Sequence, residues 1–244
     1  MTAQATLIAH CGTSKVDRDF LKQIPTPEAT RTHQPIAHTQ IVDTLIEALS
    51  FRHISVVRDE YAVSPDGNRM FGVLDLDYEF TGCRFSIGIR NSNDKSMRLA
   101  MVVGFRVTVC DNMCFSGDFQ PVLAKHSRRL ELIDVISVGV DKMQRNFEPL
   151  KQTITQWKSR SVSDSEAKLI IYEAFVEGKI PAPKILLPTV HQNYFQPLHD
   201  DFKPSTLWSL SNAFTSAFKQ LKPFQQFKAA AKLSPFLNRF EKSF

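Results

Sequence analysis

The stretch that decides the fold is HISVVRDEYAVSPDGNRMFGVLDL, residues 53–76. Two β-rich runs flank the turn sequence at 64–68, in which Pro65 presets φ and Gly67 supplies a positive φ. The sequence therefore predicts a β-hairpin here. RFSIGIR (84–90) and MRLAMVVGFRVTVC (97–110) add two further strands after short polar turns. Four successive strands with short connections indicate an antiparallel sheet.

Helical patterns lie on both sides of these strands. Apolar residues recur at helical spacing over 39–50 and again from residue 130 onward. Ser163 and Glu166 have the spacing of a capping box, and a last helix is predicted over 205–221. Strands followed by helices, rather than alternating with them, argue for an α+β fold. We expect an N-terminal arm and helix, an antiparallel sheet of four or more strands, and a helical C-terminal half packed on that sheet.

Three regions of different composition divide the chain. Prolines at 25, 27 and 35 predict an irregular N-terminal arm over residues 1–35. Residues 36–221 are expected to form a single α+β domain, and residues 222–244 a basic, phenylalanine-rich C-terminal tail. So many phenylalanines represent too much apolar area to leave in water. The tail could dock on its own domain or contact nucleic acid, but docking on a neighbouring subunit is the expected arrangement. The chain is therefore predicted to form a homo-oligomer through this tail.

Composition narrows the class of protein. No apolar run is long enough to cross a membrane, and the N-terminus lacks the pattern of a secretory signal. Four cysteines in 244 residues predict free thiols and a cytoplasmic protein. The formal net charge is +5, and residues 84–160 carry 13 basic and 7 acidic side chains. Such a block suits a polyanionic partner, although a solvated cationic face is the alternative.

Motifs for catalysis and cofactor binding are weak. Cys110 and Cys114 have a spacing found in zinc sites, but His126 stands alone where a second pair of ligands is required. Neither phosphate-binding glycine motif occurs, and nothing local orients a base toward a cysteine. We therefore predict no catalytic residue, no metal and no cofactor, and a binding protein rather than an enzyme. A turn is predicted over 110–119, with Asp111 and Asn112 bonding their own backbone and Gly117 reversing the chain.

Basic residues on the predicted sheet and on the loop that follows it are the candidate contacts to nucleic acid. Their charge could follow a phosphate backbone, and neighbouring phenylalanines could stack on bases. The residues are Arg84, Arg90, Arg98, Arg106, Lys125, His126, Arg128 and Arg129.

Several strings resemble a known family. VTVCDNMCFSGDFQPVLAKHSRR, SVGVDKMQRNFEPL, AKLIIYEAFVEGKIPAPK and LWSLSNAFTSAFKQL are similar to a phage- and plasmid-associated family of unknown function, over about residues 40–235. The resemblance transfers no catalytic residue. It implies a context of DNA replication, recombination and plasmid or phage maintenance.

These patterns together predict a nucleic-acid-binding protein. The expected partner is single-stranded or double-stranded DNA, and the expected activity is single-strand binding or annealing in DNA maintenance or recombination. One alternative is a metal-dependent enzyme acting on nucleic acid, with Asp75, Asp77 and Glu79 as ligands on one strand face. The other is a self-assembling or host-interaction protein in which the charge is incidental.

Overall fold

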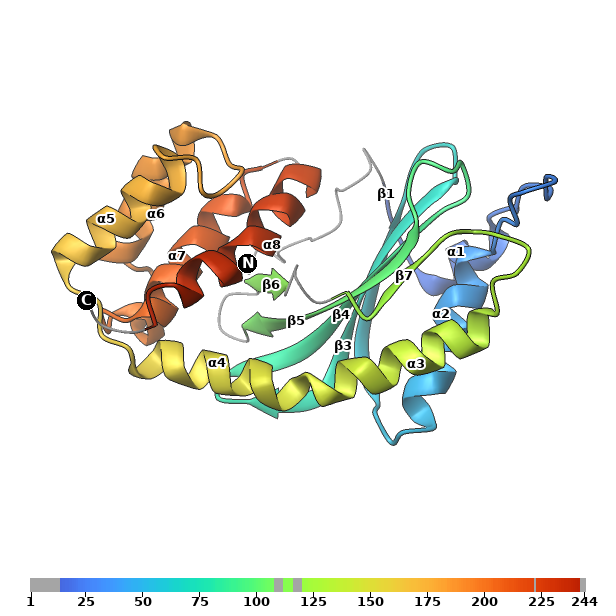
Figure 1. Ribbon diagram of the computed structural model, residues 1–244, viewed down its shortest axis with the longest axis horizontal. Helices are drawn as coiled ribbons and strands as arrows, with labels where there is room; N and C mark the ends of the chain where they lie inside the picture. The colour runs from blue at the N-terminus through green and yellow to red at the C-terminus, as the bar shows by residue number, and fades with distance from the viewer. Residues whose placement is uncertain (1–13, 108–111, 116–119, 222, 242–244) are drawn as a thin grey trace. The chain divides into compact units, whose positions relative to one another are not determined.

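The computed structural model describes residues 14–107, 112–115, 120–221 and 223–241, which divide into two compact units. The sheet unit comprises the described residues up to 106 and those from 120 to 147, and the helical unit comprises those of 107–115 and 148–241. The architecture is α+β, as predicted, with antiparallel strands first and helices in the C-terminal half (Figure 1). The single α+β domain expected over 36–221 stays a prediction.

The hairpin that opens the sheet has the predicted turn. Strands β2 (Val56–Val63) and β3 (Arg69–Phe80) pair antiparallel, with Val63 opposite Met70. Gly67 adopts a φ of 69°, a conformation that side-chain-bearing residues rarely take. The hydroxyl oxygen of Ser64 accepts a hydrogen bond from the amide of Arg69 at 2.9 Å. Turn chemistry and register therefore specify this hairpin together.

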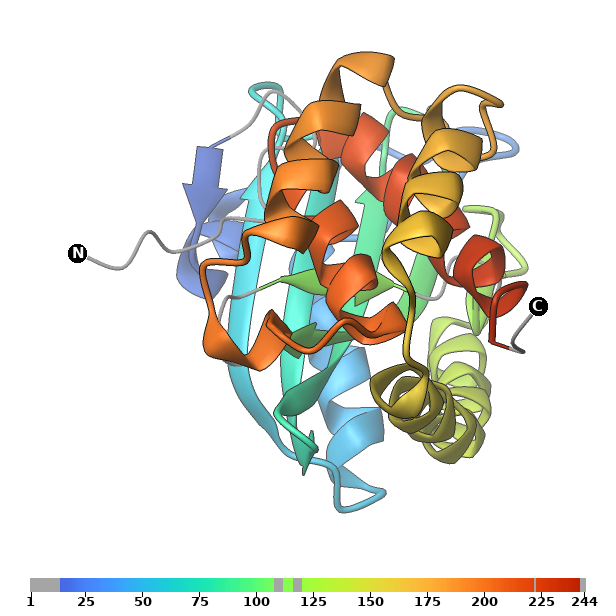
Figure 2. The same ribbon diagram turned by 90° about the vertical axis from the view of Figure 1, so that its left-hand side faces the viewer.

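The other strands of the sheet unit extend the hairpin on both sides. They are β1 (Ser14–Val16), β4 (Cys83–Ser92), β5 (Leu99–Val107) and β7 (Val122–Ala124). The order is β1-β2-β3-β4-β5, and β7 pairs antiparallel with β5. Figure 2 shows the long strands side by side.

Two helices cover part of this sheet. Leu21 of α1 (Arg18–Gln23) and Val42 of α2 (His38–Ser50) are buried against Tyr61, Val63 and Met70. The arm predicted to be irregular over residues 1–35 thus contains β1 and α1, because Leu21 supplies an apolar anchor among its polar residues. Residues 1–13 lie outside the described part of the chain.

Helix α3 (Leu132–Arg145) packs beside α2 and β7. Arg52, just after α2, donates from Nε to Asp141 at 2.6 Å and from Nη2 to the Ser137 hydroxyl at 2.8 Å. A Cβ atom at Gly139 would lie 2.3 Å from Cγ2 of Val122. Only glycine therefore allows the helix to approach β7 this closely.

The helical unit contains five α-helices and a short strand among its described residues. They are β6 (Met113–Phe115), α4 (Phe147–Ser159), α5 (Asp164–Phe175), α6 (Leu187–Phe195), α7 (Leu207–Phe218) and α8 (Pro223–Asn238), with 3-10 turns at Lys184–Leu186 and Asp200–Phe202. The predicted cap by Ser163 is confirmed, since its side chain accepts from the Glu166 amide at 3.3 Å, whereas the Glu166 carboxylate pairs with Arg160. Helix α6 accommodates Pro188 because this residue lies in the first turn, where no amide is needed.

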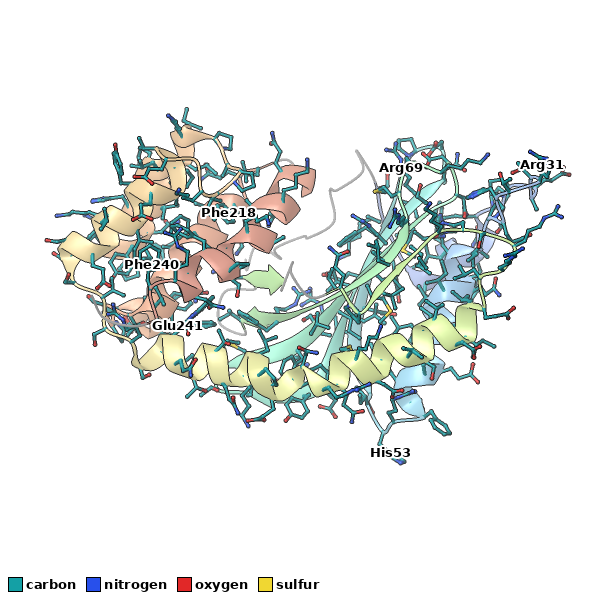
Figure 3. The ribbon with its side chains drawn as sticks, in the orientation of Figure 1. Arg31, His53, Arg69, Phe218, Phe240 and Glu241 are labelled. Carbon is teal, nitrogen blue, oxygen red and sulfur yellow. The ribbon has the colours of Figure 1, made fainter. Side chains whose placement is uncertain are left out.

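The described apolar residues near the C-terminus are buried within their own chain. Leu233, Phe236, Leu237 and Phe240 are buried, and the indole of Trp157 donates to the Asn238 side chain at 3.1 Å. Figure 3 shows Phe218 and Phe240 among the helices of this unit. The burial argument for docking on a neighbouring subunit therefore does not apply to these residues. A homo-oligomer through the tail stays a prediction without that support.

Within the described residues, no helix combines the length and the apolar character needed to span a bilayer.

Candidate nucleic-acid interface

A cationic pocket of about 420 Å³ lies in the sheet unit. Three segments that are distant in sequence line it: the end of the N-terminal arm, the turn between β4 and β5, and the residues after β7. The lining residues are Thr32, His33, Lys95, Ser96, Met97, Arg98, Lys125, His126 and Ser127. Three of the predicted contacts, Arg98, Lys125 and His126, thus meet in one place.

Strand register brings Arg98 and Lys125 together. Leu99 of β5 pairs antiparallel with Ala124 of β7. In an antiparallel ladder the residue before one partner lies opposite the residue after the other. Arg98, before Leu99, therefore lies opposite Lys125, after Ala124. The pocket is therefore built at the point where this short ladder ends.

The turn between β4 and β5 supplies the third cation, Lys95. This residue has a φ of 66°, in the left-handed region that turns use. The carboxylate of Asp94 accepts from the amide of Ser96 at 2.9 Å and faces Arg69 at 3.5 Å. Asp94, the acidic residue next to Lys95 in the turn, is thereby engaged by its own turn and by Arg69, whose position is labelled in Figure 3.

All three cations of the pocket are exposed. Lys95, Arg98 and Lys125 form no ion pair with any other residue in the described ranges. Exposed lysine and arginine side chains without carboxylate partners are available to an external anion, and their like charges concentrate a positive potential in the pocket. The pocket can therefore accept a negatively charged group.

Two buried histidines form the polar lining of the pocket. His33 and His126 are 7% and 5% exposed, and their ring centroids lie 5.5 Å apart. Nε2 of His33 lies 3.0 Å from the carbonyl oxygen of Asn93, and Nε2 of His126 lies 2.5 Å from Oδ1 of Asn91. Since both oxygens can only accept, each histidine donates from Nε2.

Asn91 connects this pair to a third buried histidine. Its Nδ2 group lies 2.9 Å from both the carbonyl oxygen of Ile36 and Nδ1 of His38. An amide nitrogen only donates, so Nδ1 of His38 accepts, and Nε2 of His38 donates to the carbonyl of Gly67 at 2.8 Å. His38 is therefore a neutral ring, and Asn91 is held with its oxygen toward His126.

Burial also keeps His126 neutral. It lowers the pKa of His126 to about 4, with a further contribution from the neighbouring rings of His33 and His38. The pKa of His38 is lowered by burial as well, although its hydrogen bond to the Gly67 carbonyl acts in the opposite direction. Near neutral pH the rings of His126 and His38 thus carry no charge, and the positive charge of the pocket comes from its lysines and arginine.

The predicted arginine face of the sheet is not continuous with this pocket. Arg106 is buried, with Nη2 3.2 Å from Glu60 Oε2 and Nε 2.9 Å from Asp75 Oδ2. Arg84 is paired with Glu79. Arg106 is thus part of an internal ion cluster, since two carboxylates on neighbouring strands hold its guanidinium away from solvent.

The remaining predicted contacts differ in their exposure. Arg90 on β4 is partly buried, and burial lowers its pKa. Arg128 and Arg129 are exposed in the turn that precedes α3, directly after the pocket residues 125–127. They extend the positive charge of the pocket along the chain.

The carboxylates considered as metal ligands do not come together. Asp75 is buried, bonded to Arg106 and to the Ser86 hydroxyl at 2.6 Å, whereas Asp77 and Glu79 are exposed. The pairing of β3 with β4 is irregular between Asp75 and Glu79, so the three carboxylates do not follow the regular alternation that would place them on one strand face. No group of three potential ligands that could hold a metal occurs among the described residues.

The turn predicted over 110–119 is only partly described. Asp111 and Gly117 lie outside the described residues, as does the side chain of Cys114. Asn112 is buried, and its Nδ2 group donates to Oδ1 of Asn212 at 3.2 Å. Its side-chain amide therefore bonds a helix in the same unit, and the bond predicted to its own turn stays a prediction, because part of that turn lies outside the described residues.

Two functional candidates were missed by sequence reasoning. Lys95 lies in a polar turn that was read as a connection, and His33 lies in the arm that was expected to be irregular. The positive φ of Lys95 leaves no clear trace in the sequence. The spacing of His33 and His38 around Pro35 was visible, but their shared contacts with Asn91 and Asn93 depend on the tertiary fold.

No family model, no curated protein and no solved structure matches this chain in comparisons with known proteins.

Proposed function

We propose that this protein binds nucleic acid, with single-stranded DNA as its expected partner, through the cationic pocket of the sheet unit. The observation that carries the proposal is the convergence of Lys95, Arg98 and Lys125 on one pocket without carboxylate partners among the described residues. Lysine and arginine contacts to phosphates supply most of the affinity in non-specific binding. Arg128 and Arg129, exposed beside the pocket, add to the same surface.

Support for a single strand comes from the form of the site. The positive charge lies in a pocket at the end of a short ladder and in a turn, and not along an exposed helix that could enter a major groove. The resemblance to a phage- and plasmid-associated family adds a context of DNA maintenance and annealing. The alternative of a metal-dependent enzyme loses its proposed ligands, since Asp75 is engaged by Arg106.

The test is the binding of a fluorescent single-stranded oligonucleotide, measured by anisotropy over a series of salt concentrations. Three phosphate contacts predict a slope of log affinity against log salt of about −2 for a single strand. The variant Lys95→Gln/Arg98→Gln/Lys125→Gln is expected to lose most of the affinity and most of this slope.

The matched control is Lys22→Gln/Lys142→Gln/Arg145→Gln. It removes the same charge from exposed positions of the sheet unit that do not line the pocket. Equal losses in the two triple variants would mean that net charge and not the pocket binds the strand. No binding of any oligonucleotide at low salt would refute the proposed function.

A further inference from the structure

The cationic pocket has the size of a site for a discrete group. Its volume of about 420 Å³ falls in the range typical of small-ligand sites, roughly 300–1,000 Å³. Side chains from three separate segments surround it, so cations converge on one space instead of following a line. A continuous strand would also need contacts beyond the pocket, such as the exposed Arg128 and Arg129, whereas the pocket itself suits the end of a strand.

The charge of the pocket matches a doubly charged group. Lys95, Arg98 and Lys125 bring three positive charges, and the side chain of Asp94 is already engaged by Arg69 and the Ser96 amide. A phosphomonoester carries about −1.5 to −2 charges at neutral pH and presents three strong acceptor oxygens. An internal phosphodiester carries one negative charge and has two free oxygens, so it would use the pocket less fully.

The hydroxyl groups on the rim suit the same ligand. Thr32, Ser96 and Ser127 line the pocket together with the three cations. Hydroxyl hydrogens can turn toward phosphate oxygens, which are among the strongest acceptors in biological molecules.

The histidines distinguish a monoester from a diester. Nε2 of His33 donates to the Asn93 carbonyl, and Nε2 of His126 donates to Asn91. In each ring the Nδ1 atom is therefore the nitrogen that can still contact a ligand. No other described residue bonds either Nδ1 atom. The neutral ring of His126 can accept at Nδ1 a hydrogen bond from a ligand that enters the pocket. A phosphomonoester, with a second pKa of about 6, can supply a P–OH group near neutral pH, and a phosphodiester cannot.

We propose that this pocket binds a phosphomonoester, and, resting on the proposed function, that its ligand is the terminal phosphate of a nucleic-acid strand. The proton shared between the phosphate and a histidine Nδ1 can reside on either partner, so the complex contains one more proton than the dianion and the neutral ring. The groups that face it are His33 from the arm, Lys95 and Arg98 from the β4–β5 turn, and Lys125 and His126 after β7.

The experiment compares three single strands of identical sequence with the dye on an internal base. One has a 5′-phosphate, one has a 3′-phosphate, and one has hydroxyl groups at both ends. We expect one phosphorylated strand to bind about tenfold more tightly than the strand without phosphate, as charge-assisted hydrogen bonds to a second charge would provide. Because the complex needs a shared proton, the preference should be larger at about pH 6 than at about pH 8.

Two variants connect the preference to the pocket. Lys125→Gln, at an exposed position, should fold normally and reduce the preference to less than threefold. His126→Gln keeps an amide donor for Asn91 and should abolish the increase of the preference from about pH 8 to about pH 6. Lys142→Gln is the control, because Lys142 is exposed on α3 and does not line the pocket. This variant should retain the preference for the phosphorylated strand and its pH dependence.

The outcomes separate this inference from the proposed function. Equal affinity for all three strands would overturn the inference and leave nucleic-acid binding intact. If no strand binds, the proposed function fails, and titration with inorganic phosphate alone then decides the inference. Saturable phosphate binding that is lost in Lys125→Gln would retain a phosphomonoester site for a small molecule, and its absence would overturn the site.

Discussion

Acidification should destabilise the sheet unit through His126, and the effect can be sized from the structure. The folded protein holds the pKa of this ring at about 4 because the ring is buried beside two other histidines, against 6.5 for an ordinary histidine. Between these pH values the unfolded chain binds a proton that the folded chain does not. Stability due to the neutral ring is therefore fully present above pH 6.5 and is lost as the pH falls toward 4.

Within this window the free energy of unfolding falls by about 1.4 kcal/mol per pH unit for one group. The loss is therefore about 2 kcal/mol at pH 5 and about 3 kcal/mol once the pH is below the pKa of the folded protein. The perturbation that isolates it is His126→Gln, whose side-chain amide can still donate to Oδ1 of Asn91. The variant is less stable than the wild type at pH 7.5 because it leaves part of the ring's space empty. Its deficit should shrink by about 2 kcal/mol at pH 5, since glutamine does not titrate.

The assay is urea unfolding at about pH 5 and about pH 7.5, followed by far-ultraviolet circular dichroism and by hydrogen exchange of the β4 amides. Trp157 and Trp208, the two tryptophans of the chain, both lie in the helical unit, so fluorescence alone would report on the wrong unit. His191→Gln, at an exposed position on α6, is the control for removal of a histidine and should leave the pH profile unchanged. A stability difference between wild type and His126→Gln that is the same at both pH values would refute the reasoning.

Two substitutions test the packing and the ion cluster of the sheet unit. Gly139→Ala should lower the free energy of unfolding by roughly 1–3 kcal/mol in thermal unfolding, because its Cβ would lie 2.3 Å from Cγ2 of Val122. The double variant with Val122→Ala should recover part of this loss. A Gly139→Ala variant as stable as the wild type would contradict the close packing of α3 on β7. Arg106→Met should cost about 3 kcal/mol in urea unfolding, the lower end for a broken buried ion pair, because it removes the cation that Asp75 shares with Glu60, while Glu60 keeps Lys15 and Arg58. A loss much below 1 kcal/mol would show that the cluster is not desolvated as the structure indicates.

The local features of the fold could be predicted because they depend on neighbours in sequence. Pro65 and Gly67 specify the hairpin turn, and the cap by Ser163 marks the start of α5. Phe236 and Phe240, four residues apart in sequence, lie beside each other with ring centroids 5.3 Å apart. What spacing could not reveal is the surface that covers them, which belongs to the same chain.

The site depended on long-range pairing and was only partly predictable. Arg98 and Lys125 were identified from charge alone, but their proximity follows from the pairing of Leu99 with Ala124 across a three-residue strand too short to recognise. Arg106 was expected at the surface because arginine is usually exposed. Its burial requires Glu60 and Asp75 on adjacent strands, a register that no single segment encodes.

His126 joins the stability of the sheet unit to the binding of an anion. The ring that is neutral in the free protein gains a proton, or shares one, when a phosphomonoester enters the pocket. Linkage is reciprocal, so an anion that raises the proton affinity of His126 must bind more tightly as the pH falls, as long as the phosphate keeps its charge. Acid destabilisation of the free protein and stronger phosphate binding at lower pH therefore involve the same ring. Burial lowers its pKa in the free protein, and its Nδ1 atom, which no other described residue bonds, takes or shares the proton when the phosphate is bound. His126→Gln must therefore reduce both the acid destabilisation seen in urea unfolding and the gain in phosphate affinity at lower pH. A variant that reduces only one of them would place the proton on another group of the pocket.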